Sequence, residues 1–290
     1  MAIVLAAAAV AVAVGLGSDD EPARAPAATS GALRVDRFDA DRAFADLRRQ
    51  VEMGPRPAGS AASRRLARWL RARVPNGRYQ KVPGGLRNVV GSIRGRGDPI
   101  VVAAHYDTKD LPGFVGANDG AGGTAAVLET ARALRRADRP ATSPPIRFVF
   151  FDGEESPDDR LDFYRSGVRG SKFYARRHAA GTRALILLDF VAERGRMRIP
   201  RESSSNPELW LELRRAAGKV GAGATFPDDT TGNVLDDHTP FIRRGVPAID
   251  LIDFTFPCFH RRCDDMSAVS ARSLDRTGEA VVQLLLDLQR

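Results

Sequence analysis

Five short runs of apolar residues divide the chain and constrain its fold more than any other feature of the sequence. Each run is rich in valine, isoleucine, leucine or phenylalanine, is apolar at successive positions, and is bounded by charged residues or glycine. A strand that is apolar at successive positions is buried on both faces, as in a parallel or mixed sheet covered by helices. The five expected strands span Asn88–Ile93, Ile100–Ala104, Ile146–Phe151, Ala184–Leu188 and Ala248–Ile252.

Segments with helical periodicity alternate with these strands. Apolar and small residues recur at the spacing of one helix face after a glycine-rich turn, at Thr124, Val127, Leu128, Ala131 and Leu134. Further helices are expected over Pro207–Lys219, over Asp236–Arg244 with Gly245 closing it, and over Ala271–Gln289. Strands that alternate with helices predict an α/β fold, a three-layer αβα sandwich with a central mixed, mostly parallel sheet.

Acidic residues and histidines follow four of the expected strands at the point where each ends. These residues are His105 and Asp107, Glu154 and Glu155, Asp189, and His260. In an open α/β sheet, ligands bind outside the carboxyl ends of the strands. We therefore expect these side chains to meet at one edge of the sheet. Oxygen and nitrogen donors of this kind suit zinc in a catalytic site that keeps one position open.

Each of these signals also has a plainer interpretation. A histidine two residues before an aspartate, as at His105 and Asp107, more often marks a loop hydrogen bond than a metal site. Adjacent glutamates are usually solvated, although Glu154 and Glu155 follow an apolar strand whose burial can hold a carboxylate as a base. Asp119 can simply cap the helix that follows it. The joint order of these residues along the chain carries more information than any one of them.

The first residues of the chain predict a targeting segment and a linker. Residues 2–16 form an unbroken apolar run, which suits a signal peptide or signal anchor better than a membrane span of about 20 residues. We expect residues 1–17 to be the signal peptide or anchor, residues 18–34 a flexible linker, and residues 35–290 one catalytic domain. A buried helix is the alternative for the apolar run. The prediction is an extracytoplasmic protein, secreted or tethered to a membrane through its N-terminal segment.

The net charge of +8 raises the question of an acidic partner. Only four of the positive residues are lysine, and the arginines are scattered in ones and twos. A nucleic-acid footprint normally clusters basic residues and interleaves them with aromatic ones. We therefore expect no nucleic-acid partner, and we expect the protein to be a monomer.

The two cysteines of the chain, Cys258 and Cys263, lie on either side of His260. They can form a disulfide that closes a short loop, or they can serve as thiolate ligands beside the histidine. No second cysteine pair exists to complete a four-thiolate zinc site. The disulfide is the favoured interpretation.

Several motifs occur in a characteristic order along the chain. They are Ala104–Thr108, Gly116–Gly123, Phe151–Glu155, Leu188–Asp189 and the late His260. Together they resemble the zinc aminopeptidase family that also contains the glutaminyl cyclases, over roughly residues 39–286. Three segments resemble the glutaminyl-peptide cyclotransferase branch more than the peptidases, namely Phe114–Asp119, Asp236–Pro247 and Asp264–Asp265. The chain departs from the animal cyclases at Phe259, where they have tryptophan.

The resemblance implies roles for individual residues. It implies that Asp119, Glu155 and His260 bind one zinc ion and that Glu154 is the general acid and base. It also implies that Asp189 and Asp236 are catalytic, because they form a hydrogen-bonded acidic group that positions the substrate.

Two reactions are compatible with these residues, and both act on peptides with a free N-terminus. In a cyclase, the α-amine of an N-terminal glutamine attacks its own side-chain amide, ammonia leaves, and one zinc ion suffices. In an aminopeptidase, two metal ions activate a water, and His105 and Asp189 complete the second site. The cyclase is the favoured prediction because Asp236 has a role only there. A third hypothesis, an inactive binding domain of this fold, would predict losses among the ligands, and none is lost.

Overall fold

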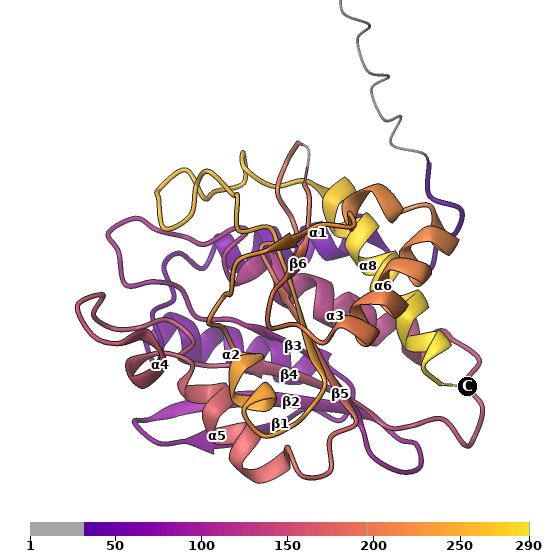
Figure 1. The fold of residues 1–290 in the computed structure, drawn as a ribbon. Coiled ribbons are helices and arrows are strands. Elements are labelled where there is room, and N and C mark those ends of the chain that lie inside the picture. The colour runs from indigo at the N-terminus through magenta and orange to yellow at the C-terminus, as the bar shows by residue number, and fades with distance from the viewer. Residues whose placement is uncertain (1–31, 196, 290) are drawn as a thin grey trace, which may run out of the picture.

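The computed structural model, which describes residues 32–195 and 197–289, is built around a six-stranded sheet (Figure 1). The strands lie in the order β1-β2-β4-β3-β5-β8. Strands β3, β4, β5 and β8 run parallel to one another, whereas β1 and β2 form an antiparallel extension beside β4. These strands are β1 (Arg78–Val82), β2 (Leu86–Ile93), β3 (Ile100–His105), β4 (Ile146–Phe151), β5 (Ala184–Asp189) and β8 (Ala248–Ile252). The predicted mixed, mostly parallel sheet is confirmed.

Helices cover both faces of this sheet. The core on one face of the sheet includes residues of five helices, α1 (Ala40–Val51), α2 (Ala61–Arg73), α3 (Ala121–Arg136), α6 (Pro207–Val220) and α8 (Ala271–Asp287). The other face packs against α5 (Arg169–His178) and α7 (Thr239–Ile242). The remaining short elements are α4 (Phe163–Ser166), the 3-10 turn η1 (Gly223–Thr225), and a small sheet of β6 (Arg201–Glu202) and β7 (Thr230–Thr231). The predicted three-layer sandwich is therefore confirmed.

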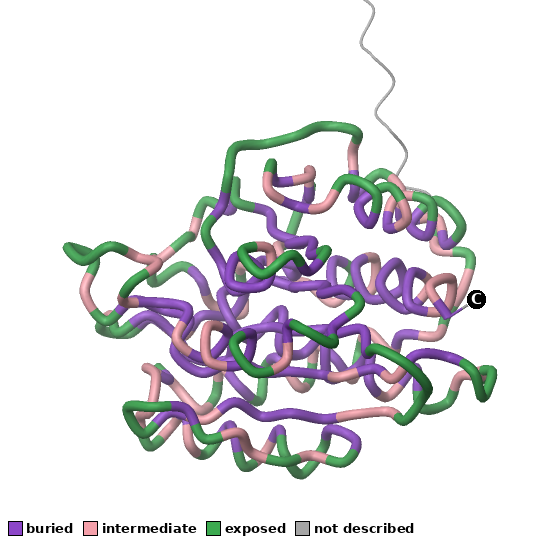
Figure 2. The backbone as a smooth tube through the Cα atoms, turned by 60° about the horizontal axis from the view of Figure 1, so that its bottom comes forward, coloured by how far each residue is buried: buried purple, intermediate pink, exposed green. Residues whose placement is uncertain are grey.

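The alternation of side chains along β3 shows why its sequence is continuously apolar. Val102 faces the helix layer that contains α3, and its neighbours Val101 and Ala103 face the layer that contains α5. Every residue of β3 is buried, and the same is true of β5. Figure 2 shows the buried backbone, in purple, as the interior of the molecule, with exposed backbone mainly in the loops.

The connections around β3 create the place where a ligand can bind. The chain passes from β3 through α3 to β4 on one side of β3, and then through α5 to β5 on the other side. In parallel sheets such a reversal opens a crevice at the carboxyl ends of the central strands. Glycine allows α3 to approach β5 closely there, because a Cβ at Gly123 would lie 2.0 Å from the backbone oxygen of Leu188.

One predicted helix is much shorter in the structure. The sequence predicts a helix over Asp236–Arg244, but α7 covers only Thr239–Ile242. The backbone N–H of Asp236 donates to the Thr239 hydroxyl, and the N–H of Asp237 donates to the carboxylate of Asp236. Such local bonds between side chains and backbone compete with helix formation. The predicted closing residue Gly245 does adopt a positive φ of 77°.

The N-terminal predictions fall largely outside the described part of the chain. The predicted signal segment, residues 1–17, and residues 18–31 of the predicted linker are not among the described residues. Between residues 32 and 289, in the part that the structure describes, no helix is both long and apolar enough to cross a membrane.

Candidate active site

Asp107 fixes the turn that presents Glu154 and Glu155. Its carboxylate accepts hydrogen bonds from three successive backbone N–H groups, those of Gly153 at 2.9 Å, Glu154 at 3.2 Å and Glu155 at 3.3 Å. Asp107 comes two residues after His105, the last residue of β3, and the turn follows the adjacent strand β4. The ends of two parallel neighbours are thereby tied together, and their acidic side chains meet at one edge of the sheet.

Asp119 lies in the turn before α3 and does not cap that helix. The N-cap is Gly120, with a φ of 87° and no side-chain cap bond. The backbone N–H groups of Asn118 and Asp119 donate instead to the carboxylate of Asp264, at 2.7 and 3.0 Å. A side chain at position 120 would collide with the backbone oxygen of Asp107, at 2.8 Å from its Cβ. The Asp119 carboxylate is left free to face the site.

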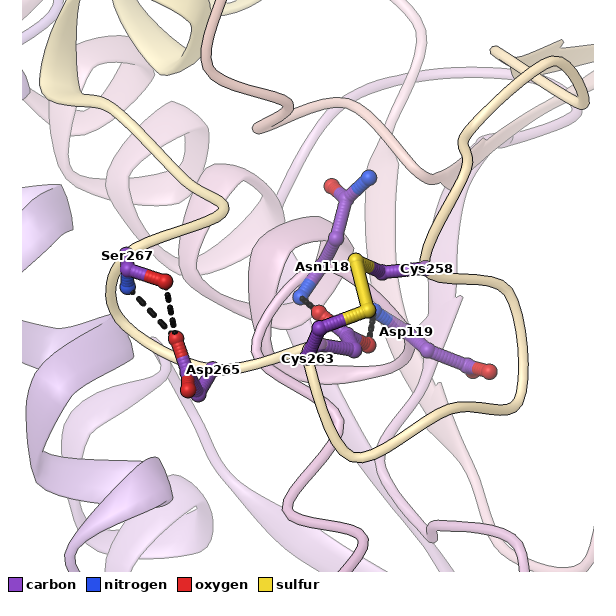
Figure 3. The surroundings of a disulfide bond; sticks show 7 residues. Asn118, Asp119, Cys258, Cys263, Asp265 and Ser267 are labelled. Carbon is purple, nitrogen blue, oxygen red and sulfur yellow. Dashed lines mark hydrogen bonds between the residues drawn. A yellow bond between two sulfur atoms is a disulfide. The ribbon is translucent and has the colours of Figure 1, made fainter.

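A disulfide loop carries His260. Cys258 and Cys263 form a disulfide, as predicted, so neither sulfur is a thiolate ligand (Figure 3). The loop is packed beside the Asp119 turn, because Asp264 follows Cys263 directly and accepts the bonds from that turn. Within the loop, the ring of His260 stacks on Phe259 at a centroid distance of 3.9 Å. The disulfide therefore restrains the segment that aims the imidazole.

The first predicted donor set comes together in the structure. The His260 Nε2 lies 3.3 Å from Glu155 Oε1 and 3.6 Å from Asp119 Oδ2. Both carboxylate oxygens are buried and have no hydrogen-bond partner. Burial, with the nearby charge of Glu155, raises the pKa of Asp119 to about 8. Two crowded carboxylates and an imidazole, with unpartnered atoms facing one another, fit a bound divalent cation.

A second donor set shares Asp119 with the first. The His105 Nε2 lies 3.3 Å from Asp119 Oδ1 and 3.5 Å from Asp189 Oδ1, and it has no hydrogen-bond partner. The three ligand atoms lie within 4.8 Å of one another. One oxygen of Asp119 thus faces His105 while the other faces His260. The geometry can hold one ion or two.

Glu154 and Asp236 line the same pocket as Asp119 and Asp189. Burial, together with the charge of Glu155, raises the pKa of Glu154 well above its ordinary value, against the opposing effect of His105. Burial and then the charge of Asp189 raise the pKa of Asp236 to about 6. Raised pKa values at carboxyl groups that line a pocket are typical of residues that donate and accept protons in a reaction.

The pocket has an acidic floor and an apolar wall. Its volume is about 460 Å³, which lies in the range typical of small-molecule sites. The floor consists of the carboxylates and the imidazole already described. The wall consists of apolar residues, namely Phe163, Phe190, Val234, Leu235, Ile252, Phe254 and Phe259.

A buried histidine cluster beneath Asp236 was not predicted. The His238 Nε2 lies 3.3 Å from Glu202 Oε1, and its Nδ1 lies 3.5 Å from Asp250 Oδ2. All three side chains are fully buried, and both oxygens of Asp250 lack a hydrogen-bond partner. The sequence did contain a signal, because Asp250 is a charged residue in the middle of the continuously apolar strand β8.

Comparison with known proteins gives a consistent picture. The family model described as Peptidase family M28 matches residues 88–285. The glutaminyl-peptide cyclotransferase of Bos taurus is 31% identical over an alignment of 224 residues, with coverage of 61% of this chain and 58% of the bovine protein. That of Bothrops jararaca is 29% identical over 238 residues, covering 65% of this chain and 61% of the relative. The chain spans about three fifths of the length of these curated relatives.

Solved structures show the same fold. The glutaminyl cyclase of Porphyromonas gingivalis is 32% identical, with a TM-score of 0.75 and coverage of 87% of this chain and 99% of that one. A leucine aminopeptidase precursor from Bacteroides thetaiotaomicron is 28% identical, with a TM-score of 0.77 and coverage of 88% and 99%. The chain therefore belongs to peptidase family M28 and resembles the glutaminyl cyclase branch of that family.

Proposed function

We propose that this protein converts the N-terminal glutamine of peptides to pyroglutamate with release of ammonia. The observation that carries the proposal is the position of Asp236, a buried carboxylate that lines the same pocket as Glu154 and Asp189. A hydrolase that activates a water between two metal ions has less use for this extra carboxylate. The likeness to bacterial and animal glutaminyl cyclases supports the same reaction.

The donor set of Asp119, Glu155 and His260 is the proposed zinc site. Two carboxylates and one imidazole are the kinds of ligand that would hold a catalytic zinc ion. Zinc bound there supplies Lewis-acid chemistry that polarises the carbonyl of the substrate's side-chain amide. The ammonium nitrogen of Lys109 lies 3.6 Å from Glu155 Oε2 and adds a positive charge beside this donor set.

Glu154 is the proposed general acid and base. It accepts a proton from the α-amine as that nitrogen attacks the side-chain carbonyl carbon, and it returns the proton to the departing ammonia. Glu154 is 7% exposed at the acidic floor of the pocket, and burial raises its pKa well above the ordinary value. A positioned acid and base of this kind typically contributes about 10²–10⁴-fold to the rate.

Asp189 and Asp236 are proposed to hold the reacting nitrogens in line. Asp189 is fixed at the end of β5, where its own carboxylate accepts from the N–H of Phe190 at 2.8 Å. Asp236 has one oxygen bonded to the N–H of Asp237 and leaves Oδ2 without a partner. An unpartnered buried acceptor beside the pocket suits the N–H groups of an α-amine or an amide.

A second candidate function is an aminopeptidase with two metal ions. It is favoured by the second donor set, in which His105 and Asp189 lie close to Asp119 Oδ1, the oxygen that faces away from His260. In that reaction the two donor sets would hold the metal ions, and Glu154 would take a proton from the attacking water. The two candidates therefore differ in whether the reaction needs His105 or Asp236.

We further propose that the protein works outside the cytoplasm. The disulfide between Cys258 and Cys263 supports this, because such bonds persist mainly in oxidising compartments. The apolar run of residues 2–16 supports export or tethering as well.

Metal content and turnover test the proposed roles together. Asp119→Ala, Glu155→Ala and His260→Ala should each lower the zinc bound per chain, measured by elemental analysis after dialysis. Glu154→Gln should keep the zinc and lose at least 100-fold in turnover, because an amide cannot take up the proton. Glu208→Ala, an exposed glutamate of α6, is the matched control and should change neither quantity. Full activity in the zinc-free protein would contradict the proposal.

A further inference from the structure

Three phenylalanines form a contiguous aromatic surface above the acidic floor. The ring centroids of Phe254 and Phe259 lie 5.2 Å apart, those of Phe190 and Phe259 lie 5.6 Å apart, and those of Phe190 and Phe254 lie 6.2 Å apart. Phe190 is buried, but Phe254 is 50% exposed and Phe259 is 39% exposed. Exposed aromatic residues that touch one another, unlike single exposed apolar residues, mark a binding surface.

The backbone is bent so that this surface and the acidic floor share one pocket. Successive residues of an extended strand point to opposite faces. Asp189 and Phe190 nevertheless both line the pocket, and Phe190 has a φ of 47°. Phe259 and His260 also both line it, and His260 has a φ of 51°. Left-handed conformations are uncommon outside glycine, most of all for a bulky residue such as Phe190, and two of them at one pocket point to a functional arrangement.

The pocket is larger than a single glutamine residue requires. Its volume of about 460 Å³ is of the size that encloses a drug-sized ligand. In the proposed reaction the α-amine and the side-chain amide of the glutamine lie on the acidic floor. The rest of the peptide must then extend through the remaining space, which lies between the phenylalanines and the segment that contains Val234 and Leu235. Leu235 is 39% exposed.

Charges in this outer part of the pocket are already paired. Apart from the acidic floor and His260, the charged residues among those that line the described pocket are Lys109 and Asp159, and they form an ion pair with each other. A charged substrate side chain would therefore lose water near the aromatic surface without gaining a partner. An apolar side chain would bury part of its own surface and part of the exposed rings.

We propose that Phe254, with Phe190, Phe259 and Leu235, forms a subsite for the side chain of the second residue of the substrate. The subsite selects an aromatic or large aliphatic residue after the N-terminal glutamine. This inference rests on the proposed cyclase function and adds the class of peptide that the enzyme prefers. Phe254 is the residue that reports on it best, because it belongs to neither donor set and is half exposed.

The test compares three substrates, which are the amides of glutaminyl-phenylalanine, glutaminyl-glycine and glutaminyl-glutamate, at saturating zinc. We expect kcat/KM for the phenylalanine peptide to exceed that for the glycine peptide by about tenfold and that for the glutamate peptide by more. Phe254→Ala should lower kcat/KM several times more for the phenylalanine peptide than for the glycine peptide. Phe254→Leu should keep most of the preference, which shows that an apolar surface is what matters.

Leu211→Ala is the matched control, since Leu211 is 43% exposed on α6 and does not line the pocket. It should leave the ratio of the two kcat/KM values unchanged. Equal kcat/KM values for the three peptides would overturn the proposed subsite but leave cyclisation established. The same holds if Phe254→Ala does not reduce the ratio of kcat/KM for the phenylalanine peptide to that for the glycine peptide. If no peptide yields a pyroglutamyl product, the proposed function fails and the subsite fails with it.

Discussion

The carboxylate of Asp107 accepts a hydrogen bond at 3.3 Å from the backbone N–H of Glu155, a residue of the proposed zinc site. The two preceding N–H groups of the turn donate to the same side chain. Asp107 is fully buried, so it lies behind the donor sets and shapes them from the backbone side. Three N–H groups that donate to one carboxylate fix the direction of the turn.

We therefore predict that Asp107→Asn disturbs both stability and activity. The amide keeps the size of the side chain but turns an NH₂ group toward backbone donors, which leaves at least one of them unsatisfied. The free energy of unfolding should fall by about 1–3 kcal/mol, and kcat should fall because Glu154 and Glu155 are no longer held in place. Urea denaturation and steady-state kinetics measure these effects. Asp110→Asn, at an exposed position, is the control, and an equal response of the two variants would contradict this role of Asp107.

The disulfide beside the site leads to the second prediction. Cys258 and Cys263 are five residues apart, and a loop this short contributes about 2 kcal/mol to stability in the chain-entropy model. The Cys258→Ser, Cys263→Ser double variant should lose about this much and should also bind zinc more weakly, because His260 lies in the loop. Thermal denaturation, zinc titration and thiol alkylation of the parent protein measure these effects. Unchanged zinc affinity in a folded variant would show that the disulfide does not position the histidine.

Glu202 gives a prediction about pH. Burial would raise the pKa of Glu202, but contacts with His238, with Ser205 and with the N–H of Ser204 outweigh it and lower the pKa to about 2. A carboxyl group whose pKa is lower in the folded state stabilises the fold above its unfolded pKa, about 4.3, and loses this contribution as the pH falls toward the folded value. The contribution at neutral pH is roughly 3 kcal/mol.

Glu202→Gln should therefore be less stable than the parent protein at pH 7, and the difference should shrink as the pH falls from 4.5 toward 2. Chemical denaturation at a series of pH values measures it. Glu208→Gln, at an exposed position on α6, should show no such change. A stability difference that stays constant down to pH 3 would contradict the ionic role of Glu202.

The sequence predicted the parts of the fold that depend on continuous burial. The expected strands Ile146–Phe151 and Ala248–Ile252 have the same bounds as β4 and β8, which are both buried strands of the central sheet. Strand β1 was not predicted, since it lies at the edge of the sheet and only Val82 is buried. Helix α2 was also missed, although Leu66 and Leu70 recur one turn apart along its buried face.

The candidate site was predictable as a set of residues but not as a geometry. The strand ends indicated where His105 and Asp189 would meet, because the carboxyl ends of parallel strands share one edge. The bonds from the Asp119 turn to Asp264 join residues 145 positions apart, and no local pattern indicates them. Long-range contacts of this kind follow from the packing of the whole chain.

Two substitutions separate the candidate reactions. Asp236→Asn should slow cyclisation by orders of magnitude, because the neutral amide no longer aligns the attacking and leaving nitrogens. His105→Ala should cost little if one zinc ion carries the reaction, whereas an aminopeptidase would lose a ligand of its second metal and most of its activity. Both variants need their zinc content measured, so that a loss of turnover is not confused with a loss of metal.

The central claim is that this pocket cyclises N-terminal glutamine. The most direct measurement is the mass of the product after the purified protein, loaded with zinc, acts on a peptide that begins with glutamine. We predict a product of unchanged chain length that is lighter by the mass of one ammonia, with free ammonia released in equal amount. Release of free N-terminal amino acids from peptides that begin with leucine or arginine, with no cyclised product from glutamine, would contradict the claim.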